Sequence, residues 1–264
     1  MRGGTQISRE GAREAGKRLG RVLDALCAMV APGLSTAALE AQARVLIAKE
    51  GAEPAFLGYR PHGAPRPYPA ALNVSINEIA AHGIPTEPER VIREGDLVKI
   101  DLGLRYRGVV VDAARSVLAG KGGSRARRLI EAARAACEAG IAALRPGQPL
   151  AVVAEAVEQT AQHYGVRVMP ELGGHGVGRS VHEEPFVPLS LLHPPSPVRA
   201  VEGMMLAIEP HLTTGKGWIT ALPDGFTLRA KDKAPVAVWE ETVWIGAHGA
   251  EILTHAQKWE ARKI

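Results

Sequence analysis

Apolar side chains recur every three or four positions in four segments of the chain, which is the pattern of amphipathic helices. These segments are residues 8–30, about 35–50, about 124–144 and about 150–164. Ser8 is a suitable N-cap for the first helix, and Pro32-Gly33 ends it. Gly51 and Gly165 stand where the second and fourth helices are expected to stop, as C-terminal caps do.

Shorter apolar runs predict β-strands, and most of them follow the helices. The runs are residues 71–75, 97–104, 108–111, 166–170, 204–209, 236–245 and 251–253. Residues 52–70 hold five prolines and predict a shaped loop. Because helices and strands are mixed along one chain, the pattern indicates an α+β fold.

A repeat divides the chain. Pro32-Gly33 precedes a helix that closes at Gly51, and Pro146-Gly147 precedes a helix that closes at Gly165 with the same offset. Each half then contains two helices followed by strands. We therefore expect one domain over residues 1–264, made of pseudo-symmetric halves at about 8–120 and 121–254, with helices packed outside a curved sheet.

Composition narrows the class of protein. The 264 residues are 46% hydrophobic, enough for a core, and no apolar run reaches the length of a membrane span. The N-terminal stretch lacks the apolar segment of a signal peptide. Cys27 and Cys137 lie in helical segments, which argues against a disulfide framework and favours the cytoplasm. The net charge of +4 suits acidic partners such as nucleic acid, although no dense basic tract is present.

Two aspartates follow apolar strands in the first half. Asp101 comes after residues 97–100, and Asp112 comes after residues 109–111. A hairpin turning near residues 106–108 would bring both carboxylates together, where a cation would offset the cost of burying them. Taken alone, the pair is equally compatible with two solvated strand ends.

The second half adds three candidates for the same site. His175 is the centre of the glycine-rich stretch at residues 173–178, Glu209 ends an apolar run, and Glu240 interrupts another. Glutamate is a poor residue in such a strand unless it has a partner. Four carboxylates and one imidazole form a mostly oxygen ligand set, which two divalent ions sharing carboxylates would satisfy.

His82 and His182 have no place in this ligand set. Each lies in a loop bounded by glycine or proline near a proposed ligand, so a structural and a catalytic role are both open. The remaining histidines lack such a setting, and we expect them to be structural: His62, His163, His193, His211, His248 and His255.

Several motifs, taken together, resemble a known family. They are Ser75-Ile76-Asn77-Glu78, His82-Gly83-Ile84-Pro85, Gly95-Asp96 before Asp101, Asp112, Gly174-His175-Gly176-Val177-Gly178, His182-Glu183-Glu184-Pro185, Ile208-Glu209-Pro210 and Trp239-Glu240-Glu241-Thr242. In this order and spacing the chain resembles the type I methionine aminopeptidases, of the short bacterial kind without an N-terminal extension. The resemblance covers nearly the whole chain.

The resemblance implies the pita-bread fold and a dinuclear metal centre. Asp101 would chelate one ion, Asp112 and Glu240 would bridge both ions, and His175 and Glu209 would complete the other. The ions would be cobalt, manganese, iron or zinc. Their shared water, with its pKa lowered toward neutral, would attack the first peptide bond of the substrate.

The resemblance also implies the substrate, the N-terminal methionine of nascent proteins and peptides followed by a small second residue. Glu209 would act as general base, and His82 and His182 would hold the substrate and its developing tetrahedral centre. The side chains that would form the methionine pocket are Tyr59, Tyr68, Asn73, Val181 and Phe226.

Some positions depart from the family pattern. Ala81 and Asn73 stand where many bacterial members have cysteine, and Val181 and Phe226 are smaller than the side chains common at their positions. Arg115 lies where a small hydroxyl residue is usual. The loop between Tyr59 and Tyr68 is longer than usual. These changes affect the expected shape of the pocket and its inhibitor preference, and they leave the reaction intact.

Two other functions fit parts of the sequence. One is a proline-specific aminopeptidase or dipeptidase on the same fold, although such relatives usually carry an additional N-terminal domain. The other is a non-enzymatic module that binds RNA or ribosomes, which the complete ligand set disfavours. We expect a cytoplasmic monomer without a membrane anchor, and the resemblance allows a transient association with ribosomes.

Overall fold

The computed structural model describes residues 7–194 and 196–255. It has four helices in this part of the chain, each within two residues of the expected ends: α1 (Arg9–Met29), α2 (Thr36–Lys49), α3 (Ser124–Ala143) and α4 (Val152–Tyr164). The side chain of Ser8 accepts the backbone N–H of Gly11 and so caps α1. Gly165, in the left-handed conformation, caps the end of α4. The helix predictions are confirmed.

The strands are more numerous than the apolar runs suggested, and most of them are short, whereas β4 and β5 are longer than expected. They are β1 (Glu53–Pro54), β2 (Asn73–Ile76), β3 (Ile79–Ala81), β4 (Leu97–Tyr106), β5 (Val109–Leu118), β6 (Arg167–Val168), β7 (Gly174–Gly176), β8 (Glu183–Val187), β9 (Met205–Ile208), β10 (His211–Thr213), β11 (Ile219–Ala221), β12 (Leu228–Ala230), β13 (Val236–Val238), β14 (Glu241–Gly246) and β15 (Gly249–Ile252). Every pairing described between them is antiparallel.

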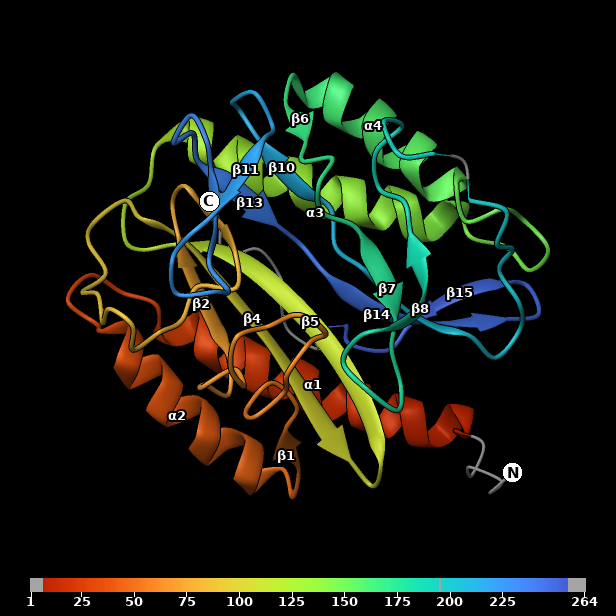
Figure 1. Cartoon of the computed structure of the whole chain (residues 1–264), viewed down its shortest axis with the longest axis horizontal. Helices are drawn as coiled ribbons and strands as arrows, with labels where there is room; N and C mark the ends of the chain where they lie inside the picture. Colours follow the sequence, from red (N-terminus) through yellow and green to blue (C-terminus); the bar gives the residue numbers. More distant parts are fainter. Residues whose placement is uncertain (1–6, 195, 256–264) are drawn as a thin grey trace.

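Two groups of strands carry the candidate residues. In one sheet β4 lies between β1 and β2 and pairs with β5, and in the other the order is β15-β14-β9-β7-β8. Helix α1 packs against β4 and β5, whereas α3 packs against β9, β10 and β13. Figure 1 shows α1 and α2 along one side of the strands and α3 and α4 along the opposite side. The α+β class is confirmed, and the two pseudo-symmetric halves stay a prediction.

The structure corrects the expected places of three acids. Asp101 and Asp112 do not end their strands, because β4 and β5 both continue well beyond them. The apolar pattern did not predict the second half of β5, because its alanines, arginine and serine are buried but do not form an apolar run. The run at 236–245 is broken at Glu240, which separates β13 from β14.

Two hydrophobic clusters hold the elements in place. One joins α1 and α2 to β4 and β5, and the other joins α3 and α4 to β9 and β14. Cys27 and Cys137 are buried in these clusters as free thiols. None of the helices in the described part of the chain combines the length and apolar character needed to cross a bilayer.

Candidate active site

The β4–β5 hairpin places two aspartates on one face. Asp101 is opposite Ala114, and Asp112 is opposite Gly103, so the acids are diagonal neighbours on the same side of the sheet. Asn73, opposite Asp101 on β2, donates its amide to Asp101 Oδ2 over 2.6 Å. The expected hairpin is confirmed, and the alternative of two solvated strand ends is wrong.

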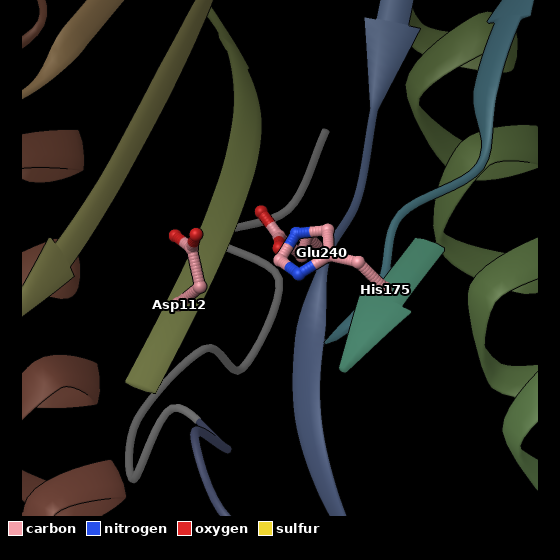
Figure 2. Close-up of side chains that lie close together, drawn as sticks. All are labelled: Asp112, His175 and Glu240. Carbon is pink, nitrogen blue, oxygen red and sulfur yellow. The ribbon is translucent and has the colours of Figure 1, made fainter. Parts of the chain in front are cut away.

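Strand β7 of the second sheet supplies an imidazole, and Glu240, between β13 and β14, supplies a further carboxylate. One ligand atom each from Asp112, His175 and Glu240 lies within 4.8 Å of the others, a spacing at which a single metal ion could contact all three. Figure 2 shows Asp112 on the β5 ribbon and His175 reaching from β7 toward it beside Glu240. These side chains come from separate elements, and antiparallel pairing aligns His175 with Ala207 of β9.

Hydrogen bonding orients His175 toward the acids. Its Nδ1 lies 2.9 Å from the carbonyl oxygen of Gly176, which can only accept, so Nδ1 carries the proton. Burial opposes the charged ring, but the hydrogen bond and the charge of Glu209 outweigh burial and raise the pKa of His175. To bind a metal the ring would be neutral, with the lone pair of Nε2 free. Nε2 lies 3.3 Å from Glu209 Oε1, which places Glu209, just after β9, at the edge of the cluster.

Two of the buried carboxylates have oxygens without hydrogen-bond partners in the described part of the chain. Asp101 Oδ1 and Asp112 Oδ1 are buried without a hydrogen-bond partner among the described residues. Burial raises the pKa of Asp112 to about 7, and burial together with the charge of Asp112 raises the pKa of Asp101 and of Glu240 well above their usual values. Buried carboxylates that repel one another in this way fit a site for cations.

Glu209 differs from the other acids. Burial favours its neutral form, but the hydrogen bond and the charge of His175 outweigh burial and lower its pKa. The backbone carbonyl of Glu209 also accepts from His211 Nδ1 over 2.9 Å. Glu209 is therefore ionised and available to take a proton. His211, expected to be structural, contacts Glu209 through this backbone bond and through a 3.9 Å approach to Glu209 Oε2.

Two further histidines lie beside the acids. His82 follows β3 with a φ of 56°, a left-handed turn that brings it into the cavity. Loss of solvent lowers the pKa of both His82 and His182, with the charge of His175 adding to the effect on His182. Both rings are thus neutral at pH 7, and each can donate a hydrogen bond. The His182 ring packs edge-on against His175, with centroids 4.5 Å apart.

One cavity, of about 530 Å³ with the open space at its mouth included, brings all the candidate residues together. They are Tyr59, Tyr68, Asn73, His82, Asp101, Asp112, His175, Val181, His182, Glu209, Phe226 and Glu240. The same cavity is lined by Phe56 and Pro61, which the sequence analysis did not single out. An apolar residue in a proline-rich loop gives no sequence signal that distinguishes a pocket wall from a core position.

Aromatic side chains also line the cavity. Tyr68 meets Phe56 and Phe226 edge-on, with ring centroids 6.4 Å and 5.2 Å away. Val181 is buried beside them, and the hydroxyl of Tyr59 lies 3.2 Å from His182 Nδ1. The cavity therefore combines carboxylates with an aromatic recess, the part lined by Phe56, Tyr68 and Phe226.

The positions that depart from the family pattern have distinct surroundings. Asn73 holds Asp101, as described above, whereas Ala81 is buried in β3 and is not among the cavity-lining residues. The loop between Tyr59 and Tyr68 is closed at its base by backbone bonds of 2.8 and 2.9 Å that Tyr68 makes with Tyr59 and Gly58. Arg66 in this loop forms an ion pair with Glu87.

Comparison with known proteins gives a single family. The sequence model of metallopeptidase family M24 matches residues 10–247. The methionine aminopeptidase of Aquifex aeolicus is 42% identical over 247 residues, covering 93% of this chain and 95% of that protein. Methionine aminopeptidase 1 of Mycobacterium tuberculosis is 39% identical over 246 residues, covering 91% and 90%.

Solved structures agree on the fold. The methionine aminopeptidase of Thermotoga maritima superposes with a TM-score of 0.86 at 32% identity and covers 94% of this chain and 98% of its own. The prolidase of Pyrococcus furiosus has a TM-score of 0.70 at 21% identity, covering 96% of this chain and 66% of its own. The second likeness shows the fold alone, and the expected pita-bread architecture is confirmed.

Proposed function

The chain belongs to metallopeptidase family M24, and from that premise we propose that it removes the N-terminal methionine from peptides and new proteins. It is a hydrolase that uses divalent metal. The observation that carries the proposal is the cavity in which Asp112, His175 and Glu240 converge beside an aromatic recess. Curated relatives named methionine aminopeptidase match more than nine-tenths of the chain.

The residues present fit two divalent ions. Asp101, Asp112, Glu209 and Glu240 would supply oxygen ligands and His175 would supply a nitrogen ligand. The two unpartnered aspartate oxygens and the raised carboxyl pKa values support cations at this place. Oxygen-rich sites with one imidazole suit manganese, iron, cobalt or zinc.

The mechanism follows from the protonation states of the side chains. When bound, the ions supply a water of lowered pKa next to the scissile carbonyl. Glu209, ionised beside His175, would take a proton from the water as the water oxygen bonds to the carbonyl carbon, and would pass that proton to the amine as the C–N bond breaks. His182 donates a hydrogen bond to the carbonyl oxygen as it gains negative charge, and His82 holds the scissile amide.

Specificity follows from the side chains that line the cavity. Methionine fits the aromatic recess formed by Phe56, Tyr68 and Phe226, because an unbranched thioether adapts to aromatic walls. The substrate's free α-amino group lies against the acids, which restricts cleavage to the chain terminus. The His82 and His182 loops leave space for only a small second side chain.

A panel of tripeptides tests the proposed function. We expect release of methionine from Met-Ala-Ser, Met-Gly-Ser and Met-Ser-Ser, and little release from Met-Lys-Ser or Met-Leu-Ser. A lost pocket contact is worth about 1–3 kcal/mol, so norleucine should be tolerated at the first position and charged residues should not. Faster cleavage of Ala-Pro-Ala than of Met-Ala-Ser would favour the proline-specific alternative instead.

Other proposals rest on the sequence repeat, the two cysteines and the family resemblance. We propose that the enzyme is a cytoplasmic monomer with a transient contact to ribosomes, and that residues 8–120 and 121–254 are pseudo-symmetric halves. A pure RNA-binding module has no use for the buried carboxylates. It would fail to hydrolyse any member of the tripeptide panel.

A further inference from the structure

A buried arginine lies directly behind the candidate metal centre. Arg115, on β5 three residues after Asp112, is 2% exposed. A guanidinium is costly to bury unless its donors are paired. The hydrogen-bond partners of Arg115 lie mainly in the segment that contains Glu240.

One guanidinium nitrogen fixes the backbone at Glu240. Nη1 of Arg115 donates to the carbonyl of Glu240 over 2.6 Å and to that of Ala114 over 2.9 Å. The N–H of Glu240 donates to the same Ala114 carbonyl over 3.0 Å. Both backbone groups of Glu240 are thus tied to β5, at the point where β13 has ended and β14 has not begun.

The second terminal nitrogen holds the residue that follows, whereas Nε is buried without a partner among the described residues. Nη2 of Arg115 donates to Glu241 Oε1 over 2.6 Å, and Glu241 Oε2 accepts the hydroxyl of Thr254 over 2.5 Å. The guanidinium carbon also lies 4.3 Å above the ring of Trp239. A single planar side chain therefore contacts three consecutive residues, with Glu240 in the middle.

The same group of residues reaches Asp112. The hydroxyl of Thr242 donates to the Asp112 carbonyl over 2.7 Å and accepts the Asp112 N–H over 2.9 Å. The N–H of Thr242 donates to the hydroxyl of Thr254 over 3.0 Å. We call Arg115, Glu241, Thr242 and Thr254 the Arg115 network, since it connects the two carboxylates that come from different elements.

We propose that Arg115 is a positioning residue that sets the separation of the Glu240 and Asp112 carboxylates, an inference that rests on the proposed function. A buried ion pair is in itself weak support for stability, whereas the rigid fork of arginine is suited to fixing geometry. Residues behind metal ligands typically change metal affinity or activity by about 10–100-fold when altered.

The test uses the full chain stripped of metal by a chelator. Arg115→Met/Glu241→Gln removes both charges together, so that neither is left buried alone. Titration with Mn²⁺ by calorimetry should show binding weakened by about 10–100-fold. The kcat for Met-Ala-Ser should fall while KM stays near that of the parent, because the aromatic recess is untouched.

A core variant separates positioning from general stability. Ile47→Ala removes a buried side chain of α2, away from the cavity. It should lower the unfolding temperature of the metal-free protein while leaving Mn²⁺ affinity and kcat at the parent's values. If the double variant behaves in the same way as Ile47→Ala, the positioning role is wrong.

Arg115→Lys covers the case in which the double variant does not fold. Lysine keeps a charge opposite Glu241 but lacks the second nitrogen of the fork, so Mn²⁺ binding should weaken, and parental affinity would overturn the inference. The parent serves as the reference for both claims. If the parent neither binds Mn²⁺ nor releases methionine, the proposed function itself fails. If it does both, only the role of Arg115 is in question.

Discussion

A methyl group added at Gly176 should disturb the metal centre without removing any ligand. The Cβ of Gly176→Ala would overlap the carbonyl oxygen of Glu184 and lie 2.8 Å from the Glu184 carbonyl carbon and 2.9 Å from the Glu183 oxygen. All three atoms are backbone, so β7 and β8 must separate by about 1 Å to restore ordinary contacts.

The shift would reach His175 directly, because the carbonyl of Gly176 accepts its Nδ1 proton. Overpacking of this kind costs about 1–3 kcal/mol of unfolding free energy. Since a misplacement of about 1 Å can cost 10²-fold in rate, we expect kcat to fall by ~10–100-fold. Mn²⁺ binding should weaken in parallel.

The assays are release of methionine from Met-Ala-Ser, calorimetric titration with Mn²⁺, and chemical denaturation of the metal-free protein. Gly123→Ala is the matched control, because its Cβ meets nothing within 4 Å. It should cost only about 0.5 kcal/mol, since alanine is a weaker N-cap than glycine for α3. Parental turnover and metal affinity in Gly176→Ala would refute the reasoning.

Three further predictions address the site and the surface. Asp112→Ala and Glu240→Ala should each abolish activity, because each carboxylate would serve both ions. Both variants should also contain less metal, as measured by atomic emission. Full metal content in either variant would contradict the two-ion assignment. His175→Ala should lose metal. His82→Ala and His182→Ala should retain metal and turn over about 10²–10³-fold more slowly than the parent. Loss of metal in His182→Ala but not in His175→Ala would show that the roles of these two histidines are reversed. The Glu50 carboxylate accepts two hydrogen bonds from the Arg21 guanidinium, over 3.0 and 2.6 Å, and these bonds lower the pKa of Glu50 from 4.5. A depressed carboxyl pKa stabilises the fold at pH values above 4.5 and ceases to do so as pH falls through the lowered value. Glu50→Gln should therefore cost about 0.5–1 kcal/mol at pH 7 in urea titrations, and an equal cost at pH 3 would contradict this.

The helices were predictable because each buries a single apolar face and most have recognisable end signals. Many strands were not, because β3, β7, β10, β11 and β12 are only three residues long. Periodicity over three residues cannot distinguish a strand from a loop. The second half of β5 was missed for a different reason, since its alanines and Arg115 are buried without forming an apolar run.

The ligand candidates were predictable because acids beside apolar runs are costly and therefore conspicuous. Phe56 was not, because an aromatic residue in a loop has the same appearance whether it lines a pocket or a core. The Arg115 network was equally hidden, since Arg115 meets Glu241 and Thr254 only after the chain has folded.

The central claim is that hydrolysis of methionyl peptides depends on metal held by this cavity. The most direct test measures methionine released from Met-Ala-Ser by chelator-stripped protein as Mn²⁺ is added back, with bound metal determined on the same samples. We predict no release without metal, and activity that rises with metal content to a plateau near two ions per chain. Full activity in the stripped protein, or metal binding without any release of methionine, would contradict the assignment.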